Sequence, residues 1–185
     1  MTDDWLLGAA RHRHARDRLL AVASSLIVEK GIDGLDVSEL ARRAHCSRAT
    51  VYRHVRGRSA IIEAVLTRSS ARIVEEVAAH VEGLTGRRRA VVALTSALAA
   101  ARRDRIASQF FSSGSAAQSQ TLIESQTVAG IATELIGLKQ PPDEHAQLAV
   151  RVLLSFLWWP ASEGEQIQLD LLADFLAHRG PQHSR

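Results

Sequence analysis

The stretch SELARRAHCSRATVYRHVRGRSAII, residues 38–62, indicates the fold class of this chain. It holds two short apolar patterns of helical spacing, the second marked by Val51 and Val55, and only His45 and Cys46 separate them. Two short helices joined by so tight a turn cannot run antiparallel for long, and they cross steeply. The spacing therefore predicts a helix-turn-helix.

Capping residues support the same boundaries. Asp36 and Glu39 predict a capping box, in which Asp36 accepts a backbone N–H and Glu39 reaches back to the N–H of Asp36. Ser47 is a predicted N-cap of the following helix, and Gly57 its predicted end. Ser59 is placed to cap the next helix.

The remaining chain is rich in helix formers and has only 4 prolines in 185 residues, which predicts an all-α protein. Upstream of the helix-turn-helix, the apolar stripe Leu19, Val22, Ala23, Leu26 and Ile27 predicts a helix between Arg16 and Lys30. Downstream, apolar stretches predict helices at Arg87–Ala101, Arg105–Phe111, Ser119–Leu138, Asp143–Pro160 and Gln166–Ala177. The N-terminus has acids before a short apolar patch, so we expect no signal peptide or membrane anchor, and a cytoplasmic location.

Positive charge is concentrated near the turn. Residues 37–58 carry six arginines against one glutamate, whereas the whole chain has a formal charge of +3. Val51 and Val55 would anchor their helix inward, which leaves Arg48, Ala49, Tyr52 and Arg53 on an outward surface. Arginine can pair with guanine, alanine can touch a thymine methyl, and Thr50, Tyr52 and His54 can donate to phosphates. A charged run is more often a solvated helix face, but the caps, the short turn and the Tyr-x-His spacing favour DNA binding.

These residues resemble the TetR family of transcriptional regulators over about Arg16 to Leu66. The family typically has an Ile/Leu-Ala pair on its second helix, a Gly-Val-Ser-like turn, then Thr-Leu-Tyr-x-His-Phe and a Lys that starts the fourth helix. The matching residues here are Leu40-Ala41, His45-Cys46-Ser47, Thr50 through Val55, and Arg58. His45 replaces the turn glycine, and histidine is among the residues that tolerate positive φ. Val55 replaces the usual phenylalanine.

The resemblance implies a set of DNA-binding residues. Arg48 and Ala49 would face bases, Arg53 is open between base and backbone, and the backbone would be held by Thr50, Tyr52, His54 and Arg58. Ser47 belongs to the same candidate set. Arg11, Arg13, Arg16 and Arg18 form a further basic arm that would reach phosphates or a minor groove, or else a soluble tail. His12 and His14 lie among these arginines, which repel a metal cation, so no metal site is expected.

The resemblance also implies a DNA-binding domain at residues 1–62 and a ligand-binding and dimerisation domain at 63–185. Dimerisation would use the last two helices, with Leu171, Leu172, Phe175 and Leu176 as a stripe. Candidate ligand-binding residues are Phe110, Phe111, Leu122, Gln126, Trp158 and Trp159. For the Phe and Trp residues among them, the alternative of a core or dimer contact is favoured over ligand binding.

The sequence thus predicts a homodimeric, TetR-like regulator that binds a palindromic operator on double-stranded DNA. The favoured version is a repressor released by a small-molecule effector. The alternatives are a ligand-independent or activating regulator, and a helical interaction module whose basic face binds an acidic protein. Cys46 is interpreted as a small buried hydrophobe. No catalytic set or cofactor motif stands out, so no enzyme and no cofactor is expected.

Overall fold

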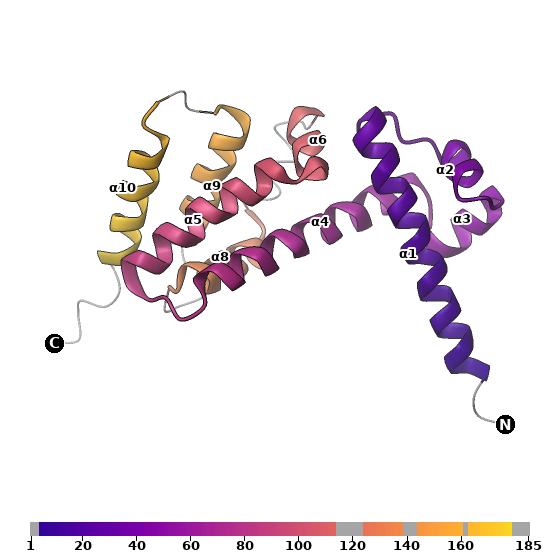
Figure 1. Cartoon of the computed structure of the whole chain (residues 1–185), viewed down its shortest axis with the longest axis horizontal. Coiled ribbons are helices and arrows are strands. Elements are labelled where there is room, and N and C mark those ends of the chain that lie inside the picture. Colours follow the sequence, from indigo (N-terminus) through magenta and orange to yellow (C-terminus); the bar gives the residue numbers. More distant parts are fainter. Residues whose placement is uncertain (1–3, 114–123, 139–143, 161–162, 179–185) are drawn as a thin grey trace. The chain divides into compact units, whose positions relative to one another are not determined.

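A computed structural model describes residues 4–113, 124–138, 144–160 and 163–178, and every regular element in these ranges is a helix (Figure 1). The helices are α1 (Asp4–Lys30), α2 (Val37–Arg43), α3 (Arg48–Val55), α4 (Arg58–Val81), α5 (Gly86–Arg103), α6 (Arg105–Ser113), α8 (Gln126–Ile136), α9 (Glu144–Trp158) and α10 (Glu165–His178). The predicted all-α fold is confirmed. The helices form two compact units, which we call the head (Met1–Ser70 with Arg105–Ser113) and the body (Ala71–Asp104 with Gly114–Arg185).

The head is built around the predicted helix-turn-helix. Its core joins the inner faces of α1, α2, α3 and α4, with Leu26, Leu40, Val51 and Ile61 fully buried. Burial of these apolar side chains is the main favourable term in the stability of so small a unit. The spacing of Val51 and Val55 therefore predicted the buried side of α3 correctly.

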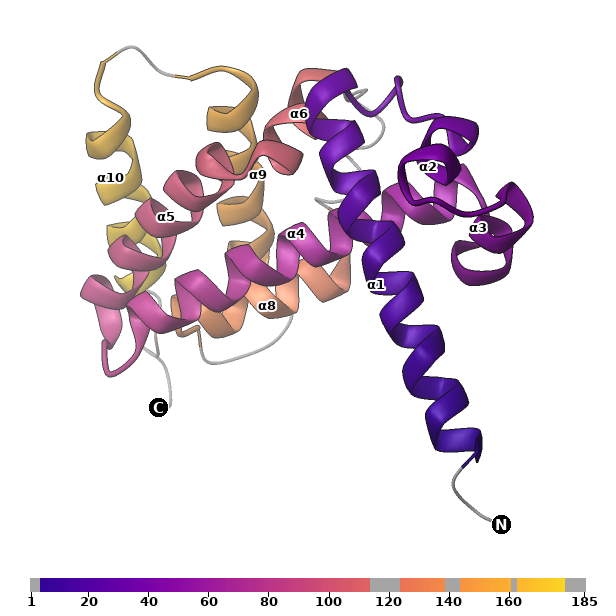
Figure 2. The ribbon, with the colours of Figure 1, turned by 45° about the vertical axis from the view of Figure 1, so that its right-hand side comes forward.

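Three helix boundaries around the helix-turn-helix differ from the sequence predictions. α1 begins at Asp4 rather than near Arg16, so the expected arm is helical (Figure 2). α3 ends at Val55, two residues before the predicted end at Gly57, because Arg56 already has the left-handed conformation at φ 55°. α4 begins at Arg58, which leaves Gly57 rather than Ser59 at the position before the helix.

A segment from the middle of the chain completes the head. α6 packs against α1, and Ile106 is buried in the same core cluster as Leu26 and Ile27. The sequence pattern of α6 indicated a helix but not its partner. The reason is that Ile106 joins a core whose other members lie within the first 65 residues, a contact that no local spacing encodes.

The body packs α5 against α8, α9 and α10. Its core contains Val77 and Val81 from the end of α4, Leu94 from α5, Phe156 from α9 and Leu176 from α10. A single side chain, Arg89, secures two helix ends in this unit. Its guanidinium donates to the carbonyls of Val81, the last residue of α4, and of Leu84 beyond it, and to those of Glu134 and Leu135 near the end of α8.

The apolar stripe predicted on the last helix divides into two sides. Leu172 and Leu176 are buried in the body core, whereas Leu171 is 64% exposed and Phe175 is 41% exposed. Ile167, one turn before Leu171, is 66% exposed. The prediction that all four residues share an intermolecular surface is therefore corrected for Leu172 and Leu176, because the body itself covers them.

Candidate nucleic-acid interface

The turn between α2 and α3 is held by the predicted N-caps. The Asp36 carboxylate accepts the backbone N–H of Glu39 at 3.0 Å, and the Ser47 hydroxyl accepts that of Thr50 at 3.1 Å. His45 has φ 52°, so the expectation that this histidine takes the positive φ of a turn glycine is confirmed. Together these features fix the starts of α2 and α3 and the turn between the two helices, and residues Ser47 to Ala49 at the start of α3 are exposed.

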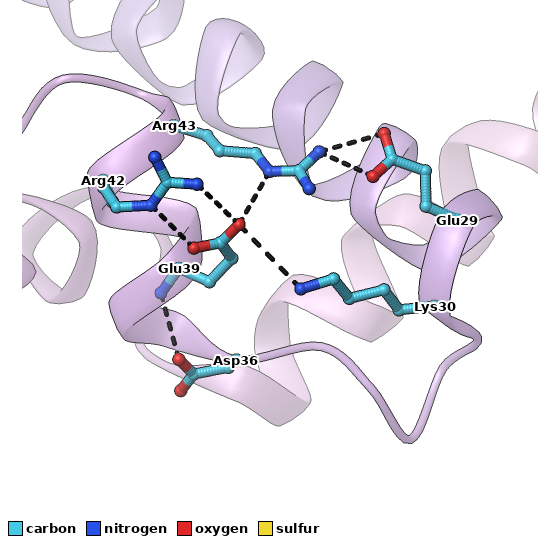
Figure 3. Close-up of polar contacts among 6 residues, drawn as sticks. All are labelled: Glu29, Lys30, Asp36, Glu39, Arg42 and Arg43. Carbon is cyan, nitrogen blue, oxygen red and sulfur yellow. Dashed lines mark hydrogen bonds and ion pairs between the residues drawn. The ribbon is translucent and has the colours of Figure 1, made fainter.

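The Glu39 side chain does not make the contact that the predicted capping box assigns to it. The Glu39 carboxylate does not turn back to the helix start but accepts hydrogen bonds from Arg42 and Arg43 at 2.8–2.9 Å (Figure 3). Arg43 also donates to Glu29 of α1, and Lys30 lies 3.9 Å from Glu39. Hydrogen bonds from Arg42 and Arg43 lower the pKa of Glu39 from 4.5 to about 2. This network fastens α2 to the end of α1 and partly neutralises two of the six arginines in the basic segment.

α3 presents its predicted outer face to solvent. Arg48, Ala49, Tyr52 and Arg53 are exposed, in contrast to the buried Val51 on the opposite side. An exposed tyrosine and arginines on the first turns of a helix can reach base edges and phosphates. The Tyr52 ring also covers Gly57, where an added β-carbon would stand 3.2 Å from the ring. Tyr52 is thereby positioned by the end of its own helix.

Two other candidates of this face are half-buried. The Thr50 hydroxyl lies 3.0 Å from that of Ser47, so both hydroxyls sit at the start of α3. The His54 ring contacts that of His12 of α1 in a tilted arrangement, with ring centroids 4.3 Å apart. Burial, and then the nearby charges of His12 and Arg53, lower the pKa of His54. Its Nδ1 is buried and has no hydrogen-bond partner among the described residues.

The Arg58 side chain makes hydrogen bonds within the head. Its guanidinium donates to the carbonyls of Ile32, Asp33 and Leu35 at 2.8–3.2 Å, which closes the loop between α1 and α2. Arg58 therefore has a structural role within the head, and its side chain is still 43% exposed. The role of Arg58 at the DNA backbone stays a prediction.

The fold and this exposed helix can be compared with known proteins. The family described as "Bacterial regulatory proteins, tetR family" matches residues 19–65, which include α2, α3 and their turn. By this match, the helix-turn-helix region of the chain is that of the TetR family.

Other regulators match the chain over nearly its full length. An HTH-type transcriptional regulator of Mycobacterium tuberculosis (strain ATCC 25618 / H37Rv) is 27% identical over 180 residues, which cover 94% of this chain and 88% of the relative. The crystal structure of a TetR/AcrR-family regulator from Thermobifida fusca YX-ER1 has a TM-score of 0.59 at 16% identity, over 90% of this chain and 98% of that one. AibR, crystallised with isovaleryl coenzyme A and operator DNA, has a TM-score of 0.51 at 14% identity, over 88% and 98%. The chain is a helix-turn-helix transcriptional regulator.

The candidate ligand-binding residues are distributed over the head and the body. Phe110 and Phe111 lie on α6 in the head, with ring centroids 5.4 Å apart in an edge arrangement. Trp158 and Trp159 lie at the end of α9 in the body, 6.2 Å apart, and Trp159 is largely exposed. Gln126 is exposed at the start of α8, and Leu122 lies outside the described residues. Their part in ligand binding stays a prediction.

Two other properties concern the described residues. No helix in them is both long and apolar enough to cross a membrane. They contain no cluster of three or more His, Cys, Asp or Glu side chains that would hold a metal ion. Sequence reasoning missed Arg56, which is exposed just after α3. Only its left-handed backbone sets it apart, and no sequence signal marks an arginine for that conformation.

Proposed function

We propose that this TetR-family regulator is a repressor that binds a palindromic operator as a homodimer and leaves it when a small molecule binds. The observation that carries the DNA-binding part is the exposed face of α3, formed by Arg48, Ala49, Tyr52 and Arg53 over a fully buried Val51. Arg48 and Ala49 read base edges, and Thr50, Tyr52 and His54 hold phosphates on either side. The activity is binding, without catalysis.

The salt dependence of binding follows from which arginines are available. Arg42 and Arg43 are paired with glutamates, and Arg58 is hydrogen-bonded to backbone carbonyls. Arg48, Arg53 and Arg56 are exposed beside the recognition face. Each phosphate contact contributes about 0.9 to the slope of log K against log salt. We therefore expect a smaller slope than contacts from all six arginines of residues 37–58 would produce.

Dimerisation would use the exposed apolar residues of the last two helices. Ile167, Leu171 and Phe175 recur at intervals of four along α10, and Leu148 of α9 is 40% exposed. The ring of His145 on α9 lies 5.5 Å from that of Phe175, so α9 meets α10 beside this exposed apolar row. A second copy of this surface, related by a twofold axis, would cover it and place two recognition helices on half-sites about 34–36 Å apart.

Release by a small molecule is the family's general mode, and AibR, a protein of the same fold, was crystallised with both an acyl coenzyme A and operator DNA. For this chain the effector's chemistry is open. An effector that favours one of two spacings of the heads by about 1–3 kcal/mol would change DNA occupancy by roughly 5–150-fold.

The test is selection of bound duplexes from a random DNA pool at about physiological salt, with Arg48→Ala run in parallel. We expect a palindrome that the wild type enriches and the variant does not. Leu171→Glu should yield monomers and lose the palindrome while keeping the unfolding transition, with the equally exposed Gln168→Glu as a control for the added charge. If the folded protein enriches no sequence, specific operator binding is wrong, and the basic face is better explained as a binding site for an acidic protein.

A further inference from the structure

A groove lies beside the recognition helix, between α1 and the α2–α3 turn. It encloses about 510 Å³ and lies wholly within the head. Its lining residues are Arg11, His14, Ala15, Arg18 and Leu19 from α1, and Ala44, His45, Cys46 and Thr50 from the turn and α3. Neither the recognition face nor the dimer surface uses it.

The charges around the groove are of one sign. Leu19 and Ala44 are buried beneath it, whereas Arg11, His14, Arg18 and His45 are exposed at its edge. No carboxylate is among the described residues that line it. An apolar floor with cationic and imidazole groups at the rim suits an anion that also carries an apolar surface, such as a sugar–phosphate chain.

The basic residues occupy one stripe of α1. Arg11, His14, Ala15 and Arg18 recur at helical spacing, which directs them to the same side. Seven residues at 1.5 Å each separate Arg11 from Arg18 by about 10 Å along the axis. That separation allows the two long side chains to contact two different phosphates of one strand rather than a single small anion. Arg13 and Arg16 do not line the groove, so the structure divides the four arginines of the predicted arm into two pairs.

The stripe is also held in place relative to α3. His12, next to Arg11, contacts the ring of His54 on the recognition helix, and Leu19 is buried in the head core. Thr50, a predicted phosphate contact, belongs to the groove wall as well as to α3. The groove is therefore continuous with the proposed DNA surface, and both views show the N-terminal part of α1 reaching beyond α2 and α3 (Figures 1 and 2).

We propose that this groove binds the DNA sugar–phosphate backbone next to the half-site, with Arg11 and Arg18 as the phosphate ligands and His14 and His45 as additional donors. The inference rests on the proposed function, because it assumes that α3 enters a DNA groove. Binding of the backbone in the groove adds affinity for DNA without sequence preference, since phosphate contacts carry no base information.

The test compares two charge-matched double variants, Arg11→Gln/Arg18→Gln and Arg13→Gln/Arg16→Gln, on the selected operator and on a random-sequence duplex of equal length. For the groove pair we expect a loss of about three- to tenfold on both duplexes, and a salt slope smaller by about 0.9 per phosphate contact removed. The selected sequence should not change. Arg11→Lys/Arg18→Lys should restore most of the affinity, which excludes a folding defect.

Equal affinities and equal salt slopes for the two double variants would overturn the groove inference. If Arg48→Ala still abolished sequence selection in that experiment, the proposed function would stand without it. Conversely, a protein that selects no operator can still support the groove. In that case the groove pair, but not the control pair, would weaken salt-dependent binding to the random duplex.

Discussion

The imidazole rings of His12 and His54 are in contact, tilted by 38° at a centroid distance of 4.3 Å, and join the N-terminal part of α1 to the recognition helix. This contact relates two histidines that are 42 positions apart in the sequence. It brings together two groups that would repel each other if both were protonated, in a place where the Nδ1 of His54 is already buried. The stability of the head should therefore depend on pH.

The sign of that dependence follows from the pKa of His54, which lies below the ordinary value of 6.5 in the folded state. Above pH 6.5 the histidine is neutral in both states and stability is complete. As the pH falls below 6.5 the unfolded chain takes up the proton first, so the free energy of unfolding decreases. Urea unfolding at pH 7.5 and 5.5 should show this decrease, and His54→Gln should show a smaller one. An equal decrease in the variant would contradict the assignment to His54.

Glu39 should control stability at lower pH. Its pKa of about 2 means that its pairing with Arg42 and Arg43 contributes fully above the ordinary value of 4.5 and is lost as the pH falls toward 2. Glu39→Gln should lower the unfolding midpoint at pH 7 and reduce the further loss on acidification. Glu63→Gln, which removes an exposed carboxylate from α4, serves as the control and should change neither quantity measurably. Thermal unfolding at pH 7, 4 and 3 would measure both.

Arg89 and Gly137 should be coupled in the stability of the body. Arg89→Ala leaves the carbonyls of two helix ends without its charged donors and should cost about 1–3 kcal/mol. Gly137 has φ 83°, and a β-carbon there would stand 2.7 Å from the Arg89 Cδ, so Gly137→Ala is strained and also displaces the arginine. In the Arg89→Ala background only the backbone strain remains. A double-mutant cycle by urea unfolding should therefore give a total loss smaller than the sum, and strict additivity would refute the coupling.

Substitutions of Arg58 and Arg48 should have different effects on stability and on DNA binding. Arg58→Ala removes the donors that close the α1–α2 loop, and because the side chain is partly exposed we expect a loss of about 1–2 kcal/mol in unfolding free energy. Arg48→Ala, at an exposed helix start, should stay within about 0.5 kcal/mol of the wild type. Chemical denaturation and operator binding on the same preparations would test this. An Arg58→Ala protein of unchanged stability but weakened operator binding would show that the arginine acts mainly on DNA.

The sequence by itself determined the helix-turn-helix. Asp36 and Ser47 act through backbone groups three residues away, and the spacing of Val51 and Val55 assigns one side of α3 to the core and leaves Arg48 and Tyr52 outside. These are interactions between near neighbours, so the order of residues is sufficient to predict them.

Only the tertiary structure decided which apolar helix faces are buried and which distant segments bury them. Leu171 and Leu172 both belong to the apolar stripe of α10, yet only Leu172 meets the body core. Ile106 enters the head, and Arg58 and Arg89 bind carbonyls 23 to 46 positions away. Such contacts depend on how distant segments pack, because helical spacing specifies which residues share a face but not which partner buries that face.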